Sequence, residues 1–360
     1  MNVRFAVASD LHIALPETID NNANRFHLTQ FSIPALEVVL EHLSTLNLDF
    51  LLLPGDLTQD GEKVNHRWLQ AKLATLPYRV YVIPGNHDVP SFQGNDKTIA
   101  FDDFPYYYQQ FGYKNTKLLD YTCEIAEGLQ LVALNSNQFN SEEKQLGCLT
   151  DNQFIWLEET LSNVTDKLVF LMIHHNVIEH LPQQSDHILG QRYMLDNAPR
   201  LLSILEKYGV KFIFTGHLHI QDISTYKGIY EITTGSLITY PHPYRILELK
   251  DNQLIIESYR ITQLPNMENL GNFSQKWTSE RSFSFMMTML TSPPLNLPLT
   301  DAQKYAPLLK HFWADIAHGD KTFNFPELPP LINQYFQQFG AIDSDGKPRL
   351  IDNNAKINLY

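Results

Sequence analysis

The stretch that decides the fold is residues 80–88, with the sequence VYVIPGNHD. Its first half is apolar and rich in β-branched residues, which predicts a buried strand over Val80–Ile83. A turn at Pro84-Gly85 follows, and then three side chains that can bind metal or donate a hydrogen bond: Asn86, His87 and Asp88. Ligands of α/β sheets bind beyond the carboxyl ends of the strands. We therefore expect this strand to deliver polar side chains to a site.

The same arrangement recurs along the chain. Short apolar strands are predicted over Val3–Ala8, Phe50–Leu53, Val80–Ile83, Leu129–Leu134, Leu168–Ile173 and Lys211–Thr215. Amphipathic helices are predicted over Ile33–Leu46, Lys63–Leu76, Asp151–Leu161 and Ala198–Tyr208. The alternation predicts a layered α/β fold. A β-rich segment without helices then follows, with strands over Glu231–Thr234, Tyr244–Leu249 and Leu254–Arg260.

The character of the sequence changes near Leu264. Residues 266–282 are polar and irregular in pattern, whereas Asp301–His318 and Leu331–Phe339 have apolar residues at helical spacing, with Asp301 as the expected N-cap. We expect residues 1–262 to form the main domain. Residues 263–360 are expected to form a mainly helical appendage, either a cap over the site or a contact between copies of the chain.

Composition limits the classes of partner. The 360 residues are 43% hydrophobic and 19% charged, as in a globular protein, and the formal net charge is -13. An acidic surface repels a phosphate backbone, so no nucleic acid polymer is expected as a partner. A small anionic substrate is compatible, because bound metal ions reverse the local potential. No apolar run approaches the roughly 18–20 residues of a membrane span, and the first residues are typical of a strand and not of a signal peptide. A cytoplasmic location without membrane insertion is therefore expected.

Five candidate strands end in Asp, Asn or His at one edge of the predicted sheet. Taken singly, each cluster has an ordinary explanation, such as a turn at Gly55-Asp56 or a solvated loop at Asp10 and His12. A single metal site explains all of them together. Carboxylate, amide and imidazole ligands suit Mn, Fe, Zn or Co. The candidate residues are Asp10, His12, Asp56, Asn86, His87, His174, His217 and His219.

These residues resemble the pattern of the calcineurin-like metallophosphoesterases: Asp-x-His, Gly-Asp, Gly-Asn-His-Asp/Glu, a strand-end His and Gly-His-x-His. The resemblance covers about the first 260 residues. It implies a four-layer α-β-β-α sandwich, here with a helical C-terminal appendage, and two divalent metal ions. The implied ligands are Asp10, His12, Asp56 and His219 for the first ion and Asp56, Asn86, His174 and His217 for the second, with Asp56 bridging. His175 is the alternative to His174.

The resemblance also implies a reaction. Two metal ions can bridge a water and lower its pKa, and the resulting hydroxide would attack a phosphodiester. His87 would be the catalytic residue that contacts the substrate and either protonates the leaving oxygen or stabilises its charge. Asp88 is expected to orient His87 or a ligand.

The outer segments resemble the class III cyclic nucleotide phosphodiesterases. The similar stretches are Gly55–Gly61, Gly147–Leu149 and Gln153–Leu157. The chain departs from that group at Asn176, where a proline usually follows the histidine pair. From the resemblance of these segments, a cyclic nucleotide or small nucleotide diester is the expected substrate. The alternatives are a phosphomonoesterase, a glycerophosphodiester or phospholipid-headgroup hydrolase and, more remotely, a non-catalytic partner-binding module.

Some residues outside the metal pattern have two interpretations. Arg192 follows the histidine pair and either binds the substrate or lies in a solvated loop. His242 follows Gly235-Ser236 near another strand end and is a second candidate substrate contact. Phe104–Tyr108 either packs in the core or forms a wall of the substrate pocket. The remaining histidines are predicted to be surface or packing residues: His27, His42, His66, His180, His187, His311 and His318.

Overall fold

Two six-stranded sheets form the centre of the molecule. The computed structural model describes residues 1–20, 22, 25–114, 116–343 and 345–359. The first sheet has the order β14-β13-β12-β1-β2-β3, and the second has the order β10-β11-β9-β8-β5-β4. The first contains β1 (Val3–Val7), β2 (Phe50–Leu53), β3 (Arg79–Val82), β12 (Pro243–Lys250), β13 (Gln253–Arg260) and β14 (Asn354–Asn358). The second contains β4 (Tyr121–Ala126), β5 (Leu129–Leu134), β8 (Leu168–Ile173), β9 (Phe212–Thr215), β10 (Asp222–Tyr226) and β11 (Ile229–Thr233). β6 (Asn137–Phe139) and β7 (Gln145–Gly147) form a separate hairpin.

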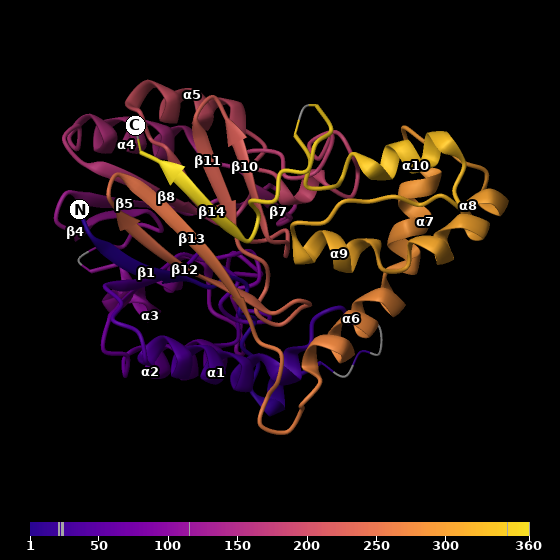
Figure 1. Cartoon of the computed structure of the whole chain (residues 1–360). Helices are drawn as coiled ribbons and strands as arrows, with labels where there is room; N and C mark the ends of the chain where they lie inside the picture. Colours follow the sequence, from indigo (N-terminus) through magenta and orange to yellow (C-terminus); the bar gives the residue numbers. More distant parts are fainter. Residues whose placement is uncertain (21, 23–24, 115, 344, 360) are drawn as a thin grey trace.

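Helices cover the outer face of each sheet. The helices α1 (Ser32–Ser44), α2 (Lys63–Leu73) and α3 (Phe104–Tyr107) lie on one side, and α4 (Asp151–Ser162) and α5 (Ala198–Tyr208) lie on the other (Figure 1). The predicted α-β-β-α sandwich is therefore confirmed. The sheets pack through aromatic side chains, since the Phe5 ring lies 5.4 Å from Phe170 and 5.8 Å from Phe214 between centroids.

The parallel strands explain where polar side chains can gather. β1, β2 and β3 are parallel, with Phe5 opposite Phe50 and Phe50 opposite Arg79. β5, β8 and β9 are parallel in the second sheet. The carboxyl ends of neighbouring parallel strands meet at one edge, so the turns that follow them lie side by side.

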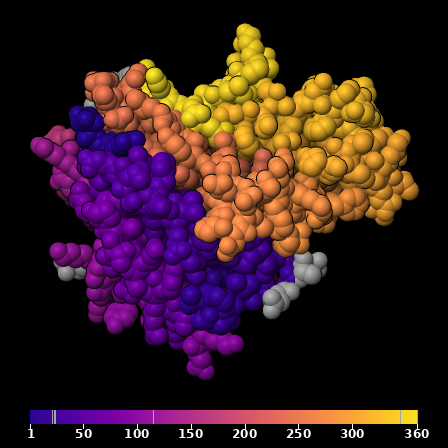
Figure 2. Space-filling model, turned by 60° about the horizontal axis from the view of Figure 1, so that its bottom comes forward, coloured from indigo at the N-terminus to yellow at the C-terminus, as the bar shows by residue number. Residues whose placement is uncertain are grey.

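The C-terminal segment is mainly helical, with α6 (Leu270–Arg281), α7 (Phe283–Thr291), α8 (Leu299–Tyr305), α9 (Phe312–His318) and α10 (Pro330–Gln337). Figure 2 shows this orange and yellow part against the indigo and purple N-terminal half. Residues 266–282 were expected to be irregular, but they contain α6. The single helix expected over Asp301–His318 is interrupted, because Pro307 lies in a 3-10 turn between α8 and α9. Among the described residues, no helix is long and apolar enough to cross a bilayer.

The end of the chain returns to the main domain. β14 pairs antiparallel with β13, with Ile357 opposite Leu254. The fully buried Arg245 on β12 donates from Nη1 to the Asp352 carbonyl at 2.6 Å. Residues 263–360 are therefore not wholly an appendage, because their last strand completes the first sheet. Residues 344 and 360 lie outside the described residues.

Candidate metal centre

The turns after β1 and β2 bring together the first ligand candidates. The Asp10 amide donates to the Gly55 carbonyl at 3.2 Å, and the His12 amide donates to the Asp56 carbonyl at 2.9 Å. The φ angles of Asp10, His12 and Asp56 are 52°, 43° and 49°. Residues other than glycine rarely adopt positive φ, and such strain concentrates at functional sites.

The first cluster contains Asp10, His12, Asp56 and His219, whose ligand atoms lie within 4.8 Å of one another. His219 Nε2 lies 3.1 Å from Asp10 Oδ1, and His12 Nε2 lies 3.7 Å from Asp56 Oδ2. The Nε2 atoms of His12 and His219 are 3.3 Å apart. Two imidazole nitrogens that face each other so closely need a proton or a cation between them. Two carboxylates and two imidazoles suit a divalent transition metal.

The second cluster contains Asp56, His174 and His217, again within 4.8 Å. His174 Nε2 lies 3.4 Å from Asp56 Oδ2 and 3.3 Å from Asn86 Oδ1. His174 Nδ1 donates to the Pro54 carbonyl at 2.8 Å, which fixes the ring as in metal-ligating histidines. Asp56 belongs to both clusters. The donor set therefore fits two divalent ions with Asp56 between them.

Two glycines allow this close approach. A Cβ atom on Gly85 would lie 2.1 Å from Asp56 Oδ1, and one on Gly216 would lie 2.3 Å from Asp10 Oδ2. The backbone next to Gly216 also holds the first cluster, because the His217 amide donates to both carboxylate oxygens of Asp10 at 3.1 Å. The glycines of these motifs are therefore explained by packing against the carboxylates of Asp56 and Asp10.

His87 lies beside the ligand clusters. Its amide donates to Asp56 Oδ1 at 2.9 Å, and its Nδ1 donates to the Gln59 carbonyl at 2.6 Å. Burial lowers the pKa of His87, but Asp56, Asp60 and the bond to Gln59 outweigh burial and raise the pKa to about 9. These three contacts favour the protonated form of the ring, which is the form a general acid needs.

Asp88 orients the ligand turns through the backbone. Its carboxylate accepts from the amides of Leu57 at 3.0 Å, Thr58 at 2.8 Å and Gly85 at 2.8 Å. These bonds tie the turn of Asp56 to the turn that begins the Gly-Asn-His motif. Asp88 thus supports ligand positions, and no hydrogen bond between its carboxylate and the His87 side chain occurs within the described part of the chain.

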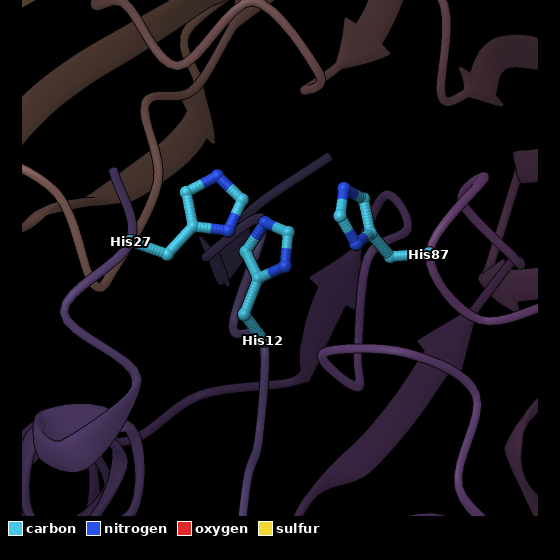
Figure 3. Close-up of side chains that lie close together, drawn as sticks. All are labelled: His12, His27 and His87. Atoms are coloured by element: carbon cyan, nitrogen blue, oxygen red, sulfur yellow. The ribbon is translucent and has the colours of Figure 1, made fainter. Parts of the chain in front are cut away.

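His27 also belongs to the site, which corrects its prediction as a surface or packing residue. Its ring lies 4.2 Å from His12, 5.1 Å from His219 and 5.5 Å from His87 between centroids. Figure 3 shows the rings of His12, His27 and His87 turned toward one another. The sequence offered one indication of this role. His27 lies on the same connection after β1 that carries Asp10 and His12.

The structure separates the remaining candidates. His175 lies outside both ligand clusters, and its Nδ1 lies 2.7 Å from Ser136 Oγ. Arg192 lines a cleft of about 460 Å³ together with Asn86 and His217. Its carbonyl accepts from His217 Nε2 at 3.0 Å.

Two other candidates are packing residues. His242 is fully buried, and its Nδ1 donates to the Leu237 carbonyl at 2.9 Å, so it is not brought to the cleft. Phe104 and Tyr108 are fully buried as well. The Tyr108 hydroxyl bonds His66 Nδ1 at 2.9 Å, so the rings of Phe104 and Tyr108 pack in the core and do not form a pocket wall, whereas Tyr106 is exposed.

The chain is similar to proteins with phosphoesterase names. A protein named "Probable cyclic nucleotide phosphodiesterase" from Vesicomyosocius okutanii is 24% identical over 220 residues, covering 61% of this chain and 79% of that protein. A "Probable glycerophosphodiester phosphodiesterase" from Arcobacter nitrofigilis is 26% identical over 235 residues, covering 63% and 76%.

A structural comparison gives the same fold. The crystal structure of a dimetal phosphatase from Danio rerio has a TM-score of 0.54 at 17% identity, covering 72% of this chain and 96% of that one. The sequence profile described as calcineurin-like phosphoesterase matches residues 3–221, more than half of the chain. The chain therefore belongs to the calcineurin-like phosphoesterase family and is a metal-dependent phosphoesterase.

Proposed function

We propose that this chain hydrolyses a small phosphodiester with the help of two divalent metal ions. The observation that carries the proposal is the position of Asp56, whose carboxylate belongs to both clusters of ligand atoms. The residues that would hold the ions are Asp10, His12, Asp56 and His219 on one side and Asp56, Asn86, His174 and His217 on the other.

Bound divalent ions supply an activated water and neutralise charge on the phosphoryl oxygens. The protein supplies orientation and a proton. The Gln59 carbonyl holds His87 Nδ1 at 2.6 Å, which leaves Nε2 as the nitrogen that would donate to the leaving oxygen. Arg192, in the cleft beside Asn86 and His217, would bind a phosphate oxygen or a base with its guanidinium group.

A diester is favoured over a monoester because both relatives described above carry the names of diesterases. A cyclic nucleotide or small nucleotide diester is the first candidate, in agreement with the outer segments of the sequence. A glycerophosphodiester is the second, because the relative from Arcobacter nitrofigilis carries that name.

The test compares the wild type with Asp56→Asn, and the exposed Asp166→Asn serves as the matched control. Bound Mn, Fe and Zn are measured, followed by turnover of bis(4-nitrophenyl) phosphate, 4-nitrophenyl phosphate, cyclic AMP and glycerophosphoethanolamine with added Mn²⁺. We expect about two ions per chain and faster cleavage of diesters than of the monoester. Asp56→Asn is expected to lose both properties, whereas Asp166→Asn keeps them.

Each alternative predicts a different result. Faster cleavage of the monoester would indicate a phosphomonoesterase. A folded wild type that binds no metal and cleaves no phosphoester would refute the proposal and favour a non-catalytic partner-binding module.

A further inference from the structure

His27 lies against the first ligand cluster without being needed as a ligand. Asp10, His12, Asp56 and His219 already offer four ligand atoms. The His27 ring nevertheless packs on His12 at 4.2 Å and lies 5.5 Å from His87. One nitrogen each of His12, His27 and His87 lies within 4.8 Å of the others. The His27 and His87 rings therefore border the same region beside the first cluster.

Gln59 holds both rings. Its side-chain Oε1 accepts from His27 Nδ1 at 3.2 Å, while its carbonyl accepts from His87 Nδ1 at 2.6 Å. Both Nε2 atoms are left without a hydrogen-bond partner in the part of the chain that the structure describes. Because Nδ1 donates to Gln59 Oε1, Nε2 is the nitrogen left to bind a ligand, and its lone pair can accept a hydrogen bond.

The backbone around His27 is also held in place. Trp277 Nε1 on α6 donates to the Phe26 carbonyl at 2.9 Å, and Arg281 Nε donates to the Arg25 carbonyl at 2.9 Å. The His27 side chain is only half-buried. A ring that is fixed at one nitrogen and on its backbone, and whose other nitrogen bonds no described residue, is preorganised to bind a substrate.

We propose that His27 is a substrate-recognition residue, whose Nε2 accepts a hydrogen bond from a hydroxyl group on the carbon next to the phosphoester. The inference rests on the proposed function and narrows its substrate class to esters of ribose or glycerol, which both carry such a hydroxyl. In this arrangement His87 faces the ester oxygen, and His27 faces the adjacent hydroxyl.

The experiment measures inhibition of bis(4-nitrophenyl) phosphate hydrolysis by two matched pairs of compounds. One pair is glycerol 3-phosphate and n-propyl phosphate, and the other is adenosine 3′-phosphate and 2′-deoxyadenosine 3′-phosphate. The wild type is expected to bind the hydroxyl-bearing member about two- to tenfold more tightly, as one hydrogen bond provides. In His27→Phe the ratio of the two inhibition constants should fall to about one. The ratio is the readout, because a general loss of activity affects both members of a pair alike.

Two further variants complete the test. His27→Asn retains an acceptor and should retain part of the preference. His42→Phe removes a half-buried histidine on α1, outside the site, which bonds the Tyr244 hydroxyl, and it should keep the wild-type ratio. A wild type without any preference, or a preference that survives in His27→Phe, would overturn the role of His27.

The failures of the two proposals are distinguishable. A wild type that cleaves no phosphoester refutes the proposed function and this inference together. A wild type that cleaves bis(4-nitrophenyl) phosphate but shows no preference for the hydroxyl refutes only the role of His27. A preference confined to one pair identifies ribose or glycerol as the group that is recognised.

Discussion

Single residues set the separation of the candidate ligand atoms. Gly216 is an example, because the site leaves no space for a Cβ atom at this position. In Gly216→Ala the new Cβ would lie 2.0 Å from Ser9 Oγ and 2.3 Å from Asp10 Oδ2. We expect this variant to lose bound metal and at least about a hundredfold in turnover, because displacement of a ligand disturbs the whole centre. Metal analysis and diester assays check this. Gly271→Ala in α6 is the control, since its Cβ meets nothing within 4 Å. Retention of full metal content in Gly216→Ala would contradict the ligand assignment.

His87 gives a second prediction at the residue scale. If His87 protonates the leaving oxygen, His87→Asn should slow hydrolysis of an alkyl ester by about 10²-fold or more. The loss should be smaller for a 4-nitrophenyl ester, which leaves without protonation. Metal content should persist, because the side chain lies outside both ligand clusters that share Asp56. Equal losses for the two leaving groups would indicate that His87 acts only through substrate binding.

At the scale of elements, α6 connects the C-terminal segment to the site. Trp277→Phe removes the donor that holds the Phe26 carbonyl next to His27. We expect this variant to weaken the preference for a hydroxyl-bearing inhibitor, while leaving metal content unchanged. The inhibition ratios described above measure the effect, with Trp68→Phe on α2 as the control. An unchanged ratio in Trp277→Phe would show that Gln59 alone positions His27.

A buried ion-pair network fixes the loop after β8. His180 Nδ1 lies 2.5 Å from Asp222 Oδ2 on β10, and its Nε2 lies 3.1 Å from Glu231 Oε1 on β11. Glu231 also accepts from the Val177 amide at 2.9 Å and from Asn176 Nδ2 at 3.1 Å. The network accounts for Asn176, where the resembling group usually has proline, because its side chain bonds the same carboxylate.

This network makes stability depend on pH. Burial lowers the pKa of His180, but Glu231 and Asp222 outweigh burial and raise the pKa from 6.5 to about 10. The proton is bound more tightly in the folded state, so the stabilisation is complete below pH 6.5 and is lost as the pH rises toward 10. The difference in free energy of unfolding between the wild type and His180→Gln should therefore be largest near pH 6 and shrink toward pH 10. Urea denaturation across this range, with His42→Gln as control, tests it. A difference that does not change with pH would contradict a charged His180.

At the scale of the whole molecule, the last strand holds the C-terminal segment to the core. Deletion of residues 351–360 removes β14 and the carbonyl of Asp352 that accepts from the buried Arg245. We expect a loss of about 3 kcal/mol in the free energy of unfolding, because a buried charge loses a hydrogen-bond partner. Urea denaturation measures it. Lys356→Ala, an exposed position on β14, should change the free energy by less than about 0.5 kcal/mol. An unchanged midpoint after the deletion would show that β14 is peripheral to stability.

Many apolar residues of the C-terminal helices have partners within the chain, whereas Leu299, Leu308 and Leu331 are exposed. Met286, Phe312 and Phe336 pack in one core with Leu218 and Ile220, which flank His219. The helical pattern that led us to expect a contact between copies is thus accounted for in part within a single chain. Oligomerisation remains a prediction, which light scattering of the full chain can test.

The local pattern of the sequence was sufficient to predict the layers, and it supplied most residues of the candidate site. Apolar strands that end in Asp10, Asp56, Asn86, His174 and His217 have a short-range signal, since the strand and the polar turn are contiguous. Parallel pairing then brings these ends to one edge. The helix break at Pro307 was also present in the sequence but was missed, because the apolar spacing continues across it.

Tertiary structure decided the features that neighbouring residues in the sequence do not indicate. β14 is a polar stretch whose pairing depends on β13, nearly a hundred residues earlier in the chain. His27 stands alone in its loop and becomes part of the site only because Gln59 and α6 hold it beside His12 and His87. The sequence by itself determined which strands form and which candidate ligands follow them, since both depend on neighbouring residues. Which distant side chains join those ligands was decided by packing between segments far apart in the chain.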